Sequence, residues 1–208
     1  GIFTLIIPAL FLGWHENLTY FQSWHRQMVA PYAAGVVTSE HKNQSLPGLL
    51  HRMLGEEASF SDYEEDRKII LDTHNIVTLP RAVVHGIILT CMGLFVALTL
   101  WHFRAECMDR DSLLLVAEFS IVSLGMLLFC ERTWKHHCVI LLFPFAVCAY
   151  VVSAEGFTRS LRWQVGMPAL LALTLMLLTT SGIFDRHLDS DDRLGKLAQV
   201  YGAYVWAF

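Results

Sequence analysis

One short stretch of the chain, residues 131–137, gathers five ionisable side chains between two apolar blocks. Clustered charge at a membrane boundary is costly unless it is solvated, paired or bound to a ligand. Arg132 and Lys135 suit a phosphate because cations neutralise it, while His136 and His137 can donate a hydrogen bond or a proton. The stretch therefore predicts a site for a phosphorylated ligand. An ordinary interfacial loop with a Trp anchor and snorkelling side chains fits the same residues.

A second polar stretch, residues 41–46, carries two amides, Asn43 and Gln44. Amide side chains are common partners of sugar hydroxyls because each offers donors and an acceptor. The same residues also suit the cap of a following helix, since Pro47 behind Ser45 is typical of a first helical turn. Asn43 and Gln44 are therefore predicted either to contact a sugar or to order this part of the chain.

Three further ionisable residues, His85, His102 and Glu118, lie within the apolar blocks. An ionisable side chain inside a membrane span is a candidate functional group. A structural interpretation is equally open, such as a pairing of Glu118 with His85. The adjacent His136 and His137 are not expected to share a metal, because neighbouring side chains on a helix diverge by about 100°. No metal or other cofactor is predicted.

Composition and patterning indicate the elements that must position these residues. Of the 208 residues, 54% are hydrophobic and 16% are charged, whereas a soluble domain carries about 25% charged residues. A long apolar block in hydrocarbon must pair its own backbone, so each block is predicted to be a helix. Four blocks are predicted to span the membrane: Arg81–Phe103, Ser112–Cys130, Cys138–Ala154 and Trp163–Ile183. The pI of about 6.2 and the absence of a Lys/Arg run indicate no nucleic-acid partner.

Both ends of the chain are apolar as well. Residues 2–12 are too few to span a bilayer, and residues 197–208 are predicted to be a spanning helix that stops within the membrane. We therefore expect residues 1–208 to be a single membrane domain, truncated at both ends relative to a longer polypeptide. Residues 81–208 are predicted to form its transmembrane helices, and residues 14–80 a long polar connection.

The connection 14–80 contains two runs of apolar residues with helical spacing, in 18–32 and in 46–54. Both are predicted to be amphipathic helices that lie on the membrane or on the helix bundle. The acidic stretch 55–68 is predicted to be a solvated loop. If each apolar block spans once, the connection 14–80 and the segment 131–137 face the same compartment. Charge bias between the loops does not indicate which compartment that is.

Two of these motifs together resemble glycosyltransferase family 87, bacterial membrane enzymes of the GT-C superfamily. They are the Asn-Gln-Ser-Leu segment at 43–46 and the Trp-Lys-His-His segment at 134–137, which runs directly into the apolar stretch 139–144. The likeness is to the C-terminal half of such enzymes and covers most of this chain. It implies an all-α, polytopic transmembrane helical bundle with amphipathic helices in a long extracytoplasmic loop.

The resemblance also implies an inverting hexosyltransferase that moves a sugar, typically mannose or arabinose, from a polyprenyl-phosphate donor to a lipid or glycan acceptor. It places the active face on the extracytoplasmic side of the bacterial cytoplasmic membrane, among membrane lipids. His137 and His136 are then assigned to the catalytic centre. The residues assigned to substrate binding are Lys135, Arg132, Trp134, Asn43 and Gln44. The carboxylate that acts as general base is expected in a region that this chain does not contain.

Two other functions stay open on the sequence. A transporter or flippase for an anionic lipid or solute would use Glu118, His85 and His102 as an intramembrane relay. A non-catalytic scaffold would not need the His pair. A transporter is expected to carry polar groups along several spans, whereas the polar groups here gather in two connections on one side. This distribution favours the transferase.

Overall fold

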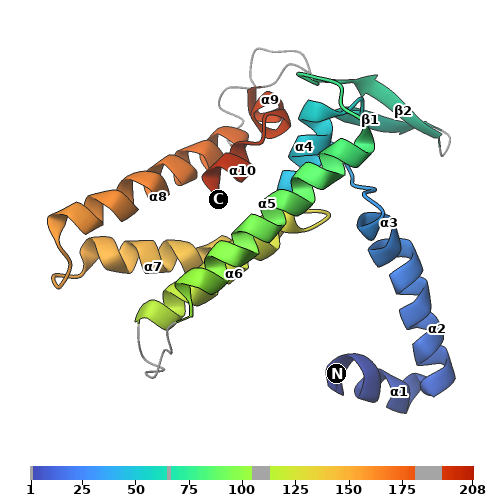
Figure 1. The fold of residues 1–208 in the computed structure, drawn as a ribbon, viewed down its shortest axis with the longest axis horizontal. Coiled ribbons are helices and arrows are strands. Elements are labelled where there is room, and N and C mark those ends of the chain that lie inside the picture. The colour runs from blue at the N-terminus through green and yellow to red at the C-terminus, as the bar shows by residue number, and fades with distance from the viewer. Residues whose placement is uncertain (1, 65–66, 105–112, 181–193) are drawn as a thin grey trace. The chain divides into compact units, whose positions relative to one another are not determined.

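The computed structural model describes residues 2–64, 67–104, 113–180 and 194–208 (Figure 1). The chain divides into two compact units, Gly1–Val37 and Thr38–Phe208, and each is described by itself. Helices dominate both units, as the apolar blocks of the sequence predict.

The first unit is a nearly continuous run of helix that turns at Gly13. A proline explains why the run changes pitch near its end. Pro31 has no N–H to give to the carbonyl four residues earlier, which interrupts the α-helical hydrogen-bond ladder. The helix predicted over residues 18–32 is confirmed. The elements of this unit are the π-helical turn η1 (Ile2–Ile6), α1 (Ile7–Leu12), α2 (Trp14–Trp24), the π-helical turn η2 (His25–Val29) and α3 (Ala30–Ala33).

The second unit begins with an extended segment that leads into α4 (Leu46–Leu54). Ser45 caps this helix, because its Oγ accepts the N–H of Gly48 at 3.2 Å. Pro47 lies in the first turn, where its missing N–H costs nothing. The predicted start of this helix is therefore confirmed.

A two-stranded antiparallel ribbon follows, formed by β1 (Phe60–Glu64) and β2 (Arg67–Asp72). It corrects the prediction of a solvated loop over residues 55–68, and it is an exception to an all-α fold. The sequence signal was present but masked by the acidic residues. Tyr63, Ile69 and Ile70 are residue types that favour strands.

Apolar helices make up most of the second unit. Among the described residues, three apolar segments are long enough to cross a membrane, Arg81–His102, Lys135–Ser153 and Arg159–Thr179, which indicates a multi-pass membrane protein. The middle segment consists of a 3₁₀ helix that continues directly into an α-helix. The elements are α5 (Arg81–His102), α6 (Leu113–Phe129), η3 (Lys135–Leu141), α7 (Leu142–Ser153) and α8 (Arg159–Thr180).

These helices match the four predicted spans with shifted ends. The predicted span 112–130 corresponds to α6, which has 17 residues and is the shorter apolar helix of the set. The third span begins at Lys135, so His136 and His137 lie in a helical turn and not in a loop as predicted. The fourth begins at Arg159, and residues 181–183 at its predicted end lie outside the described residues.

The surfaces of the apolar helices are consistent with contact to lipid. Large apolar side chains are exposed along them, among them Leu94, Leu100, Met126, Leu142 and Leu170. Contiguous exposed apolar surface of this extent is rare on soluble monomers but is ordinary for helices in a bilayer.

The C-terminal segment does not form the spanning helix predicted over residues 197–208. It forms two short helices, α9 (Leu194–Val200) and α10 (Ala203–Ala207), with a break between them. Gly202 makes the break with φ +74°, a left-handed conformation that only glycine adopts without strain. A Cβ at this position would lie 2.6 Å from Cδ2 of Leu49 in α4, so the Leu49 side chain would have to move to make room for one.

Two small hydrophobic clusters lie where these elements meet. Leu49 and Met53 of α4 pack with Phe60 and Val200. The other cluster joins Leu127, Cys138, Leu141 and Tyr204. Together they gather α4, the end of α6, the start of η3 and the C-terminal helices at one end of the second unit (Figure 1).

Candidate functional site

Asn43 holds the segment before α4 against the loop that follows α6. Its side chain is fully buried. Its Nδ2 donates to the carbonyls of Thr38 and Glu131, both at 2.7 Å. Its Oδ1 accepts the N–H of Thr133 at 2.9 Å and that of Ser45 at 3.2 Å. These four bonds use the full hydrogen-bonding capacity of the amide.

Gln44 connects the same two segments to each other and to the C-terminal helices through further hydrogen bonds. Its backbone N–H donates to the carbonyl of Thr133 at 2.7 Å, and its Nε2 donates to the carbonyl of Gln199 at 3.0 Å. Nε2 also donates to the carbonyl of His41. Because Asn43 and Gln44 are both fully buried, the geometry supports the role of ordering the loop. Their contact with a sugar stays a prediction.

The hydrogen bonds of Asn43 and Gln44 also show that the two polar motifs lie next to each other. Asn43 bonds to Glu131 and Thr133, which are 88 and 90 positions away in the chain. The segment 41–46 and the stretch 131–137 therefore lie at the same end of the apolar helices, as the alternation of predicted spans indicates.

Among the residues whose burial the structure describes, Arg52 in α4 has the largest fully buried side chain, and sequence reasoning missed it. Burial lowers the pKa of its guanidinium to about 10, so the group stays cationic at neutral pH. The available signal was a lone cation inside an otherwise apolar helical run. Five hydrogen bonds of 2.8–3.3 Å join the guanidinium to the backbone carbonyls of Ser39, Glu40, Asn43, Gln199 and Val200.

The turn between α6 and η3 is fixed from both sides. Thr133 is fully buried, and its Oγ1 donates to the carbonyl of Leu127 at 2.5 Å. The N–H of Trp134 donates to Nδ1 of His137 at 3.2 Å, while the N–H of His137 donates to the carbonyl of Trp134 at 2.9 Å. Because Nδ1 accepts, the neutral ring of His137 carries its proton on Nε2. His137 is exposed, so this Nε2–H is a hydrogen-bond donor for a ligand.

His136, His137 and Trp134 form a group that we call the Trp-His-His cluster. All three residues are exposed. The ring centroids of the two histidines lie 4.2 Å apart. The Trp134 ring lies 5.5 Å from that of His136 and 6.4 Å from that of His137, nearly parallel to the latter. The cluster stands at the first turn of the apolar segment Lys135–Ser153.

Both predicted cations flank this cluster and have partners within the protein. Arg132 donates from Nε to Oγ1 of Thr38 at 2.9 Å and lies 3.6 Å from a carboxylate oxygen of Glu131. Lys135 donates from Nζ to the carbonyl of Thr179 at 2.6 Å, in the last turn of α8. A cation is favourable there because it meets the negative end of the helix dipole. Arg132 and Lys135 are both exposed, so their charges also face solvent or ligand.

Two further histidines near this end, His51 and His41, contact other side chains of the protein. His51 is buried, and its Nδ1 lies 3.2 Å from Oε1 of Glu57, which also pairs with Arg81 at 3.0 Å. Burial raises the pKa of the Glu57 carboxyl, but His51 and Arg81 outweigh burial and leave it below its usual value. His41 packs its ring 4.6 Å from that of Phe60. Burial, helped by nearby cations, lowers the pKa of His41 to about 4, so this imidazole is neutral at physiological pH.

The intramembrane residues singled out from the sequence do not connect with one another. In the described part of the chain, no hydrogen bond or ion pair joins Glu118 to His85. Nδ1 of His102 lies 2.9 Å from the carbonyl of Leu98 in its own helix. Among the described residues, no three His, Cys, Asp or Glu side chains are grouped closely enough to hold a metal ion.

Comparison of the chain with protein-family models, with curated proteins and with solved structures finds no match in any of the three. The likeness to glycosyltransferase family 87 therefore rests on the residues of the two motifs.

Proposed function

We propose that this chain forms the donor-binding end of an integral membrane glycosyltransferase. The enzyme takes a sugar, mannose in the first instance, from a polyprenyl phosphate and transfers it to a lipid or glycan acceptor. One observation carries the proposal: the exposed Trp-His-His cluster, flanked by Arg132 and Lys135, stands at the start of an apolar segment. A polyprenyl-phosphate sugar matches this arrangement, because its polyprenyl chain lies in the hydrocarbon and its phosphate lies at the membrane boundary.

The reaction exchanges one bond at the anomeric carbon of the sugar. The acceptor hydroxyl oxygen bonds to this carbon while the bond to the phosphate oxygen breaks, and that electron pair leaves with the phosphate. The hydroxyl proton passes to a carboxylate that acts as general base, as the family resemblance implies. Arg132, Lys135 and the Nε2–H of His137 stabilise the charge that develops on the leaving phosphate. His136, with its ring centroid 4.2 Å from that of His137, supplies a second imidazole.

The buried hydrogen bonds of Asn43 and Gln44 support a role of the Trp-His-His cluster in stabilising the transition state. Asn43 and Gln44 fix the backbone of Thr133 through its N–H and its carbonyl, one residue before Trp134. Groups that stabilise a transition state are effective when their positions are set before the substrate binds. Under this proposal, the end of the second unit that contains Asn43, Gln44 and the Trp-His-His cluster faces the extracytoplasmic side.

The test uses the full-length protein in proteoliposomes supplied with radiolabelled polyprenyl-phosphate mannose. We expect label to move into lipid or glycan with the wild type, and His137→Ala to lower the rate by about tenfold or more. His137→Gln is expected to keep part of the rate, because its amide can donate a hydrogen bond in place of Nε2–H. His102→Ala is the matched control, another exposed histidine whose ring bonds within its own helix.

The outcomes separate the two candidate functions. If the folded wild type transfers label from no polyprenyl-phosphate sugar, the transferase is refuted, and a transporter or flippase for an anionic lipid or solute takes its place. If transfer occurs but His137→Ala and His102→Ala behave alike, the enzyme stands and the assignment of its site is wrong.

A further inference from the structure

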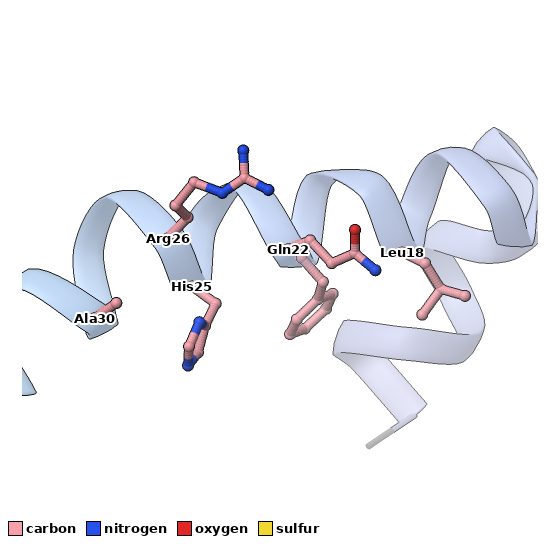
Figure 2. A pocket seen from close by; sticks show the side chains of 6 residues that line it. Leu18, Gln22, His25, Arg26 and Ala30 are labelled. Carbon is pink, nitrogen blue, oxygen red and sulfur yellow. The ribbon is translucent and has the colours of Figure 1, made fainter.

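A shallow groove of about 420 Å³ runs along the helical run of the first unit (Figure 2). Its walls are two rows of side chains spaced four residues apart, which lie one turn above another on a helix. One row is Phe21 and His25, and the other begins at Leu18 and Gln22. The complete lining is Leu18, Phe21, Gln22, His25, Arg26 and Ala30. The groove thus has apolar residues at both ends and polar groups between them.

The groove spans the π-helical turn His25–Val29. Such turns widen a helix locally and occur frequently at functional sites. Ala30, the residue after the turn, is small and leaves this end of the groove open. The proline that follows it, Pro31, lacks the N–H that would continue the α-helical ladder across this turn.

Exposed aromatic side chains elsewhere on this helical run indicate the environment of the helix. Trp14, Tyr20 and Trp24 are 59%, 58% and 55% exposed. The run continues from α1, whose Leu10 and Phe11 are exposed as well. Tryptophan and tyrosine prefer the headgroup level of a bilayer, and the described residues include three segments able to span one. A helix with these side chains suits the headgroup level of a bilayer.

The charge of the groove identifies what it can hold. Arg26 is the one lysine or arginine of residues 1–37, and Glu16 is the one acidic residue. They are ten positions apart on the run, about 15 Å at 1.5 Å per residue. Within the described residues of this unit, Arg26 makes no hydrogen bond or ion pair. The groove therefore combines an unneutralised guanidinium, the Gln22 amide and apolar walls.

We propose that this groove binds the phosphate headgroup of an anionic membrane phospholipid. Arg26 pairs with the phosphate, because a guanidinium matches two phosphate oxygens at once. Gln22 donates to the headgroup, and Leu18 and Phe21 contact the first carbons of the acyl chains. The proposal does not depend on the transferase reaction, since it involves only the first unit and a lipid.

The test measures lipid binding to the whole protein by native mass spectrometry in detergent. Phosphatidylglycerol is titrated onto the wild type, Arg26→Gln and Arg26→Lys, with phosphatidylcholine as the zwitterionic comparison. Lys42→Gln is the matched control, because Lys42 is also an exposed cation and lies outside the segments able to span a membrane. We expect Arg26→Gln to weaken phosphatidylglycerol binding by about fivefold, the effect of one cation near an anionic surface. Arg26→Lys and Lys42→Gln are expected to bind much as the wild type does.

Three results would overturn the proposal. Equal affinity of the wild type for phosphatidylglycerol and phosphatidylcholine would show that headgroup charge is not recognised. Equal binding by Arg26→Gln and Lys42→Gln would show that the lipid binds elsewhere. Glycerol phosphate that competes as well as phosphatidylglycerol would show a site for a free phosphate and not for a lipid. Transferase activity is not measured in any arm, so failure here leaves the proposed function untouched.

Discussion

Replacement of Asn43 by alanine removes the side chain that joins the two polar motifs. Its Oδ1 accepts from the N–H groups of Ser45 and Thr133, and its Nδ2 donates to two carbonyls at 2.7 Å. In Asn43→Ala these N–H groups stay buried without an acceptor, at about 1–3 kcal/mol each. Together with the two lost donors, we expect Asn43→Ala to lower the free energy of unfolding by about 3–5 kcal/mol.

Asn43→Asp separates the two halves of this interaction. The carboxylate keeps both acceptor positions but turns an oxygen toward the carbonyls of Thr38 and Glu131, which now lack a donor. We expect Asn43→Asp to be at least as destabilising as Asn43→Ala at neutral pH. The loss should decrease as the pH falls, because a protonated carboxyl regains one donor and its pKa is raised by the two carbonyls.

The assay is denaturant-induced unfolding of the detergent-solubilised protein, followed by circular dichroism. Asn75→Ala is the control, since Asn75 is exposed and makes one exposed hydrogen bond, to Thr78. It should change the free energy of unfolding by less than about 0.5 kcal/mol. A loss below about 1 kcal/mol for Asn43→Ala would refute the reasoning, because it would mean that the four bonds do not hold the two segments together.

Three other substitutions test separate features by the same unfolding assay. Arg52→Met leaves five carbonyls without their donor, in four buried hydrogen bonds and one part-buried hydrogen bond, and we expect a loss of about 3 kcal/mol or more; a neutral result would contradict the structural role of this cation. The pKa of His41 is about 4 when folded against 6.5 when unfolded, so the unfolded chain binds the proton more readily between these values. The free energy of unfolding should therefore fall as the pH drops from 6.5 toward 4, and His41→Gln should reduce that slope. Gly202→Ala should cost about 2 kcal/mol through its left-handed φ and its clash with Leu49, whereas Gly86→Ala, with open space around its Cβ, should not destabilise.

The features that could be predicted from the sequence are those set by neighbouring residues. Apolar blocks of membrane-spanning length predict α5, α7 and α8 because the preference of each block for hydrocarbon is local. The start of α4 follows from Ser45 and Pro47 in the same way. The strands β1 and β2 were missed because charge outweighed strand preference in the interpretation of their residues.

The features that could not be predicted depend on contacts between distant parts of the chain. Arg52 gives no local sign that its acceptors are carbonyls 147 and 148 positions away. The apolar character of residues 197–208 predicts a span, but Gly202, which lies against Leu49 of α4, takes a left-handed φ of +74° and divides that run into two helices. For the candidate site, residue types indicated Asn43 and His137 alike, and only the fold separates a buried connector from an exposed ring.

The hydrogen bonds of Arg52 also have a consequence for the synthesis of the protein. Two of its five acceptors, the carbonyls of Gln199 and Val200, do not exist until 147 and 148 further residues have been added. At about 5–20 residues per second, translation takes about 7–30 s to reach them. During this interval residues 38–55 carry a cation whose final partners are missing, while the apolar helices between are already being inserted. A nascent chain stalled before Gln199 should therefore be cut by protease in this segment, and the finished chain should not.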